Sequence, residues 1–73
     1  MELTEETIKM IEDYAKFSGQ SEEQVVDYIL FEFLENQVSI IEKKAQELNK
    51  PVNELLNMQF VRILEGLMLQ KQN

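Results

Sequence analysis

The most apolar stretch of the chain, residues 21–34, has the pattern of a helix that belongs in a core. Ser21 is suited to cap its N-terminus, and Gln24 three residues later completes the pattern of a capping box. At about 100° per residue, six apolar side chains fill a continuous half of the helix surface, wider than the stripe of a surface helix. They are Val25, Val26, Ile29, Leu30, Phe33 and Leu34.

Signals for helix ends divide the chain into three helical segments. Thr4 is suited to cap a first helix that ends at Ser18, where Gly19 supplies a left-handed C-terminal residue. No Gly or Pro interrupts the chain between Ser21 and Pro51, so we predict one long helix there, with a kink allowed near residues 36–39. The predicted fold is all-α with three to four helices, over about residues 4–18, 21–48 and 52–69.

A shift of 30 residues aligns the chain with itself. Residues 11–35 then lie on residues 41–65, and the breaker at Gly19 falls on Asn49. Five pairs are identical, including Ile11/Ile41, Ala15/Ala45 and Leu34/Leu64. The pattern predicts a helix–turn–helix unit present twice in one domain of residues 1–73, with pseudo-repeats at about 8–37 and 38–67. The shared periodicity of any two amphipathic helix pairs is the alternative explanation.

Two sets of apolar residues follow from this pattern. The first is a core or interface set on the main apolar arcs, made of Val26, Ile29, Leu30, Phe33, Leu34, Leu56, Phe60, Ile63 and Leu64. The second set lies outside those arcs in both pseudo-repeats and consists of Tyr28, Phe31, Met58 and Val61. Apolar residues outside the core arc need cover, so we predict a second packing surface, buried across an intramolecular four-helix core, in a homodimer or against another protein.

The size of the chain favours self-association. A chain of 73 residues buries only about 60% of its unfolded surface, which leaves its stability marginal. It has no Cys and no His, so neither a disulfide nor a typical zinc site can reinforce it. Oligomerisation remains as the stabilising device, and we predict a homodimer.

Charge is unevenly distributed along the chain, whose net charge is −7. Residues 1–37 carry ten acidic side chains and two lysines, whereas residues 38–73 are close to neutral. An acidic surface repels phosphate, so nucleic-acid binding is disfavoured and a basic protein is the better partner. The chain lacks a signal-peptide pattern and any apolar run near the ~20 residues that span a bilayer, which predicts a cytoplasmic protein without membrane contact.

No catalytic, cofactor-binding or metal-binding residues are predicted. The acidic residues stand at helix starts and on polar faces, where capping and solubility explain them. Lys43, Lys44 and Lys50 could bind phosphate, but Lys43 and Lys44 alternate with Glu42 and Glu47 as on a solvated helix face. Since there is no His, Cys, phosphate loop or nucleophile motif, an enzyme is not expected.

The first helix pair resembles that of the ribbon–helix–helix regulators, the Arc/MetJ-like family, over residues 3–36. The resemblance is carried by the inward Ile8, Ile11 and Ala15, by the G-x-S turn at Gly19, and by the apolar helix after it. It implies two chains interlocked through their helices, with an N-terminal strand of each reading DNA. Thr4 occupies the position that ends this strand, and no basic or amide side chain precedes it. The short–long–short order of helix lengths also resembles the histone fold.

These observations predict a small, acidic, non-enzymatic protein that regulates by protein–protein contact, of the antirepressor or antitoxin kind. The alternative is a DNA-binding transcriptional regulator of the ribbon–helix–helix type, which would require a basic strand. A ligand-carrying helical bundle would require an enclosed cavity.

Overall fold

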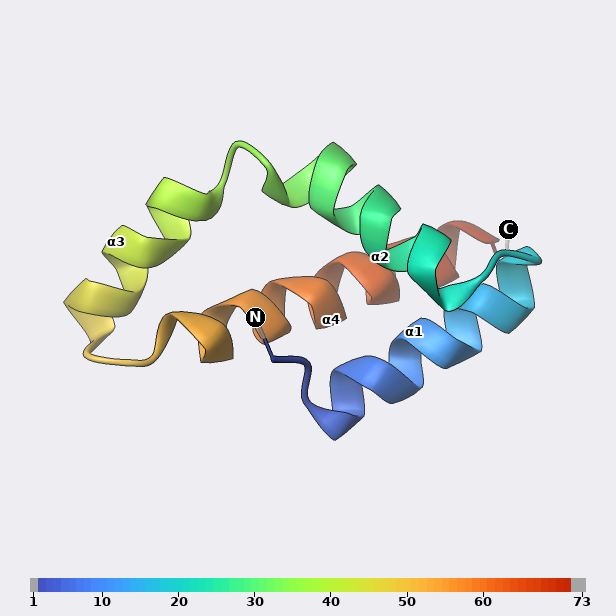
Figure 1. Ribbon diagram of the computed structural model, residues 1–73, viewed down its shortest axis with the longest axis horizontal. Coiled ribbons are helices and arrows are strands. Elements are labelled where there is room, and N and C mark those ends of the chain that lie inside the picture. Colours follow the sequence, from blue (N-terminus) through green and yellow to red (C-terminus); the bar gives the residue numbers. More distant parts are fainter. Residues whose placement is uncertain (1, 72–73) are drawn as a thin grey trace.

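The computed structural model describes residues 2–71, so Met1, Gln72 and Asn73 of the predicted domain lie outside it. The described residues form helices α1 (Glu5–Ser18), α2 (Glu22–Ile29), α3 (Val38–Leu48) and α4 (Val52–Lys71), and a π-helical segment η1 (Leu30–Leu34). Residues 2–71 contain no strand, and the predicted all-α fold is confirmed. Helix α4 runs along the molecule, packed against α1 and α3, while α2 packs on α1 (Figure 1).

Local signals specify both ends of α1 and the α1–α2 turn. The Thr4 hydroxyl accepts from the Thr7 N–H at 3.2 Å, and Gly19 ends α1 in the left-handed region at φ 72°. At the start of α2 the capping box is complete. The Ser21 hydroxyl accepts from the Gln24 N–H at 3.1 Å, and the Gln24 side chain accepts from the Ser21 N–H at 2.9 Å. The turn is therefore encoded by residues within it.

The α3–α4 turn is built in the same way, 30 residues later. Asn49 occupies the left-handed region at φ 55°, as Gly19 does in the first turn. The Lys50 N–H donates to the Ala45 carbonyl at 2.9 Å, and the Gln20 N–H donates to the Ala15 carbonyl at 3.0 Å. Both are the long hydrogen bond of a Schellman motif. The likeness of the turns agrees with a repeated unit, whereas a duplication of the sequence stays a prediction.

The single long helix predicted over 21–48 is wrong. Helix α2 passes into η1, the chain turns at residues 35–37, and α3 starts at Val38. The allowed kink near 36–39 falls close to this break. Within η1 the backbone follows an i→i+5 pattern, so the buried positions step from Val25 to Ile29 by four residues and then to Leu34 by five.

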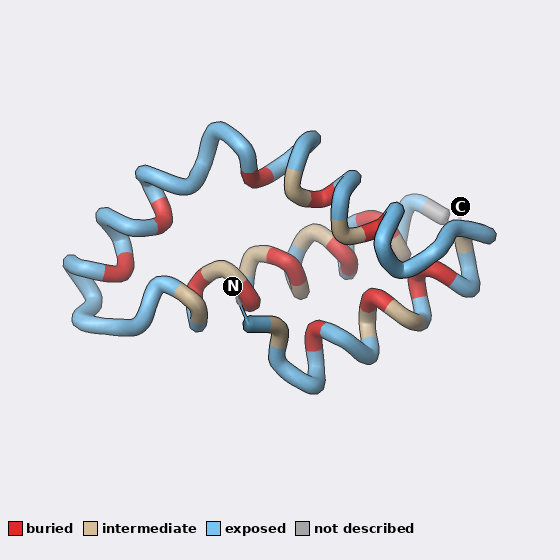
Figure 2. Tube along the Cα trace, viewed as in Figure 1, coloured by how far each residue is buried: buried red, intermediate tan, exposed pale blue. Residues whose placement is uncertain are grey.

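The core lies on the sides of the helices that face the middle of the molecule (Figure 2). Four of the predicted core residues, Ile29, Leu34, Phe60 and Leu64, are buried. Val26, Leu30, Leu56 and Ile63 pack against the core and are partly exposed. Phe33 was expected on the inner arc but is 40% exposed. The π-helical step explains this, because it turns Leu34 inward where an α-helical register would bring Phe33.

Two asparagines of α4 hold the N-terminal segment. The Asn53 side chain donates to the Glu2 carbonyl and accepts from the Glu2 N–H, both at 2.8 Å. The buried Asn57 donates to the same carbonyl at 2.7 Å and accepts from the Thr4 N–H at 2.9 Å. These bonds satisfy the polar groups of Asn57, whose burial would otherwise be unfavourable. They join the first described residues to the start of α4.

Candidate interaction surface

Four large apolar side chains are exposed around the break between η1 and α3. The exposed fractions are 66% for Phe31, 40% for Phe33, 44% for Val38 and 60% for Ile40, and we call this set the break surface. The π-helical step directs Phe33 outward. Ile40 is exposed because its neighbour Ile41 occupies the inward position of α3. Such grouping of apolar side chains is typical of a surface that another molecule covers.

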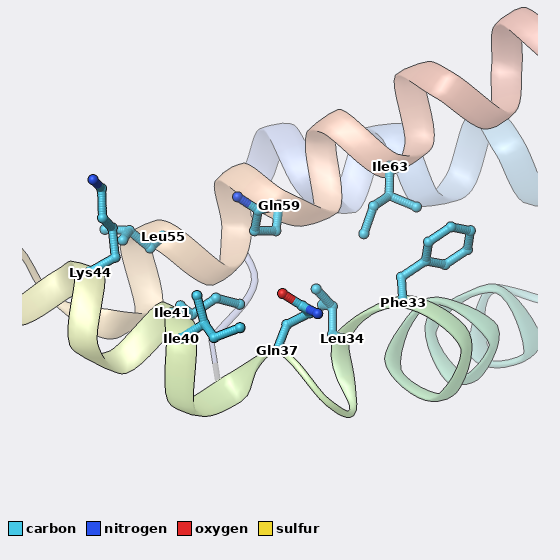
Figure 3. A pocket seen from close by; sticks show the side chains of 9 residues that line it. All are labelled: Phe33, Leu34, Gln37, Ile40, Ile41, Lys44, Leu55, Gln59 and Ile63. Carbon is cyan, nitrogen blue, oxygen red and sulfur yellow. The ribbon is translucent and has the colours of Figure 1, made fainter.

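An inner groove of about 370 Å³ lies between the break and α4. Phe33 lines it together with Ile63 of α4, which lies across from it in Figure 3. Leu34, Ile41 and Leu55 supply further apolar walls. Gln37, Lys44 and Gln59 add polar groups. This mixture suits a protein surface with a few polar groups better than an entirely apolar ligand.

An outer groove of about 460 Å³ lies beside the same segment. Phe31 and Val38 of the break surface line it, with Leu30 and Leu56 beside them. Glu35 is its one charged lining residue among the described residues. Leu34 lines both grooves. The break surface thus has a hollow on either side of the buried Leu34.

The predicted second surface is divided among separate places. Tyr28 stacks edge-on against Phe33, with ring centroids 5.6 Å apart, and Phe31 lines the outer groove. Met58 and Val61 instead line a third hollow of about 300 Å³ that also includes Thr4 and Thr7 of the N-terminal region. The structure therefore brings Tyr28 and Phe31 to the break, and leaves Met58 and Val61 on the α1 side of α4.

Sequence reasoning missed Phe33, Val38 and Ile40 as surface residues. One signal was available for α3, since at about 100° per residue Ile40 lies outside the apolar stripe of Val38, Ile41 and Ala45. The exposure of Phe33 had no comparable signal, because it depends on the π-helical register.

Charged groups lie beside the break surface rather than within a closed site. Glu32 and Glu35 are exposed on its η1 side, and Lys44 lines the inner groove. The ion pairs Lys9–Asp13, at 2.9 Å, and Lys50–Glu54, at 3.8 Å, are on other parts of the surface. A hydrogen bond from Lys9 to Asp13, aided by the charge of that carboxylate, raises the pKa of Lys9. As an exposed pair it contributes little to stability.

Within residues 2–71, no three His, Cys, Asp or Glu side chains gather closely enough to hold a metal ion. None of the described helices is both long and apolar enough to cross a bilayer. Comparison of the chain with family models, curated proteins and solved structures gave no significant match. Function is therefore inferred from the geometry of the chain itself.

Proposed function

We propose that this protein is a non-enzymatic interaction module that forms a homodimer through the break surface and regulates a basic protein by direct contact. The observation that carries the proposal is the grouping of Phe31, Phe33, Val38 and Ile40 around two open grooves. Fully burying a Val, Ile or Phe side chain stabilises a protein by about 1.5–3 kcal/mol. Because a chain of 73 residues buries only about 60% of its unfolded surface, such cover would add to a marginal stability.

The charge of the chain supports a basic protein as the regulated partner. Its net charge is −7, and α1, α2 and η1 hold most of the acidic side chains. A field of this sign attracts a basic protein and speeds the encounter with it. Antirepressors and antitoxins act in this way on DNA-binding proteins and toxins, so this chain is proposed to belong among such modulators.

Sedimentation equilibrium tests the self-association. We expect a dimer for the unchanged chain and a monomer for Phe31→Asp, because the substitution places a charge in the apolar surface. Phe17→Asp is the matched control, since Phe17 is 48% exposed on α1 and lies outside the break surface. Circular dichroism should show equal helix content in all three proteins. A Phe31→Asp variant that stays dimeric would contradict the proposed interface.

Salt dependence separates the partner from the self-association. Added salt screens attraction between opposite charges, so a basic protein captured from the source cell at low salt should be released as salt rises. Two chains of charge −7 repel each other, so the homodimer should persist or tighten under the same conditions. Recovery of duplex DNA instead of a basic protein would overturn the proposed regulation while leaving the dimer standing.

A further inference from the structure

We propose that the homodimer forms by exchange of chain halves. In it, α2, η1 and α3 join into one continuous helix, and the α1–α2 half of each copy packs on the α3–α4 half of the other. The inference rests on the proposed self-association and specifies its form. The occupant of the break surface is thus a second copy of this chain.

The break lacks every local feature that ends the other helices. The Glu35 backbone is helical, at φ −50° and ψ −45°, and Gln37 also lies in the right-handed region, at φ −108° and ψ −7°. The Gln37 side chain makes no capping hydrogen bond. The positive φ values of residues 2–71 are those of Gly19 and Asn49, both outside this segment. Since the bend has neither a residue at positive φ nor a side-chain cap, we infer that residues 35–37 can also adopt a continuous helix.

The buried positions of α2, η1 and α3 form one stripe. They follow one another at intervals of three to five residues when Val38 is included, as one face of a helix with a π-helical step requires. The stripe consists of Val25, Ile29, Leu34, Val38, Ile41 and Ala45. In the bent chain the two parts of this stripe, before and after the bend, face the interior of the same molecule. Val38, at the bend, is 44% exposed. A straight helix would present the same stripe to halves supplied by two different chains.

Contacts between the two halves do not depend on their belonging to one chain. The halves meet through the packing of α1 on α4 and through the hydrogen bonds of Asn53 and Asn57 to residues 2–4. Residues 35–37 are the covalent connection between them. A second copy can therefore supply every one of these contacts unchanged, which is the condition for exchange of identical elements.

Exchange also accounts for the break surface. In a two-fold dimer of this kind the connecting segments of the two chains lie beside each other near the axis. Phe31, Val38 and Ile40 flank that segment on both sides. The side chains that the bent monomer leaves exposed thus come to cover their counterparts in the other copy. Closed monomers that dock side by side would use the same surface, so the test must separate the two arrangements.

Proline at position 38 distinguishes a bend from a continuous helix. Val38 is the first residue of α3, where proline removes no hydrogen bond within the helix but disfavours the backbone of Gln37, at ψ −7°. In a continuous helix position 38 would be interior, and proline there would in addition remove a helical hydrogen bond and clash with the preceding turn. We expect Val38→Pro to be a folded monomer whose dissociation constant for dimerisation is raised at least about 100-fold. Val38→Ala removes the same exposed side chain without blocking the helix and should remain largely dimeric. A dimeric Val38→Pro variant would overturn the exchange.

Disulfide trapping gives a second test that does not depend on how well Val38→Pro folds. The chain has no cysteine, so Glu2→Cys with Asn53→Cys provides a single pair at positions that are hydrogen-bonded in the structure. After oxidation of the isolated dimer, exchange predicts a covalent dimer on a non-reducing denaturing gel. A covalent monomer from that dimer would overturn the exchange while the proposed interaction function stands. A chain that sediments as a monomer at all concentrations would refute both.

Discussion

The turn between α1 and α2 and the bend between η1 and α3 both redirect the chain, but they do so for different reasons. The first contains Gly19 at positive φ and the capping box of Ser21 and Gln24. The second contains neither. There the Gln37 N–H donates to the Leu34 carbonyl, and the Gln37 carbonyl accepts from the Ile41 N–H, both at 2.9 Å. The first turn is fixed by its own residues, whereas the bend is held by the packing of distant helices on α4.

This difference indicates that the bend, rather than the α1–α2 turn, is where the chain can change conformation. A turn with a left-handed glycine and a capping box keeps its form in any tertiary context that preserves the two helices. A bend without such signals persists only while burial of Leu34 and Ile41 favours it over a straight helix. Substitutions in the two places should therefore have different consequences.

The largest expected effect concerns the π-helical register before the bend. Leu34→Ala should lower the free energy of unfolding by about 2–5 kcal/mol, because Leu34 is 2% exposed. Phe33→Ala should lower it by at most about half as much, since Phe33 is half-exposed. Urea denaturation at concentrations where the chain is monomeric measures both. A larger loss for Phe33→Ala would indicate an α-helical register instead.

A smaller effect on stability is expected from a substitution in the α1–α2 turn. Gly19→Ala should destabilise the protein by about 1–2 kcal/mol, because alanine is strained in the left-handed conformation at φ 72°. Asn36→Ala in the bend is the counterpart. It should change the free energy of unfolding by less than about 0.7 kcal/mol and increase the fraction of dimer, since alanine favours a helix more than asparagine does. Equal destabilisation by the two substitutions would remove the distinction between turn and bend.

The smallest effect compares the two residues that precede α2 and α3. Ser21→Ala removes the hydroxyl that caps α2 and should reduce stability by about 1 kcal/mol. Gln37→Ala removes a side chain without a capping bond and should be close to neutral. Thermal unfolding of the two variants beside the unchanged chain gives the answer. A marked loss for Gln37→Ala would mean that its side chain supports the bend.

The parts of the fold that could be predicted are the helix ends that a few neighbouring residues determine. Gly19, Ser21 and Asn49 mark helix ends by their own conformational preferences, and the predicted helix boundaries near them agree with the structure. A kink was allowed near residues 36–39, close to the observed break, but the complete break and the π-helical step before it were not predicted, because both depend on tertiary packing rather than on particular residue types.

The candidate site was predicted only in part for the same reason. Phe31 was expected on a second surface and is strongly exposed, whereas Phe33 was placed in the core or interface set from an α-helical period and is 40% exposed. Met58 and Val61 share the helical phase of Tyr28 and Phe31 across the repeat, yet they line another hollow, beside Thr4 and Thr7. The position of a residue around a helix predicts which way its side chain points only while the helix continues regularly, and the α-helix does not continue regularly through η1 and the bend.

The asparagines that hold the N-terminal segment also affect the rate at which monomer and exchanged dimer interconvert. Opening the chain for exchange requires the Glu2 and Thr4 hydrogen bonds to Asn53 and Asn57 to break together with the packing of α1 on α4. The monomer and the exchanged dimer are then separated by a barrier close to that of unfolding. After dilution, monomer and exchanged dimer should interconvert much more slowly than subunits that associate without exchange. The ratio of the two forms in a sample should therefore depend on how the sample was prepared.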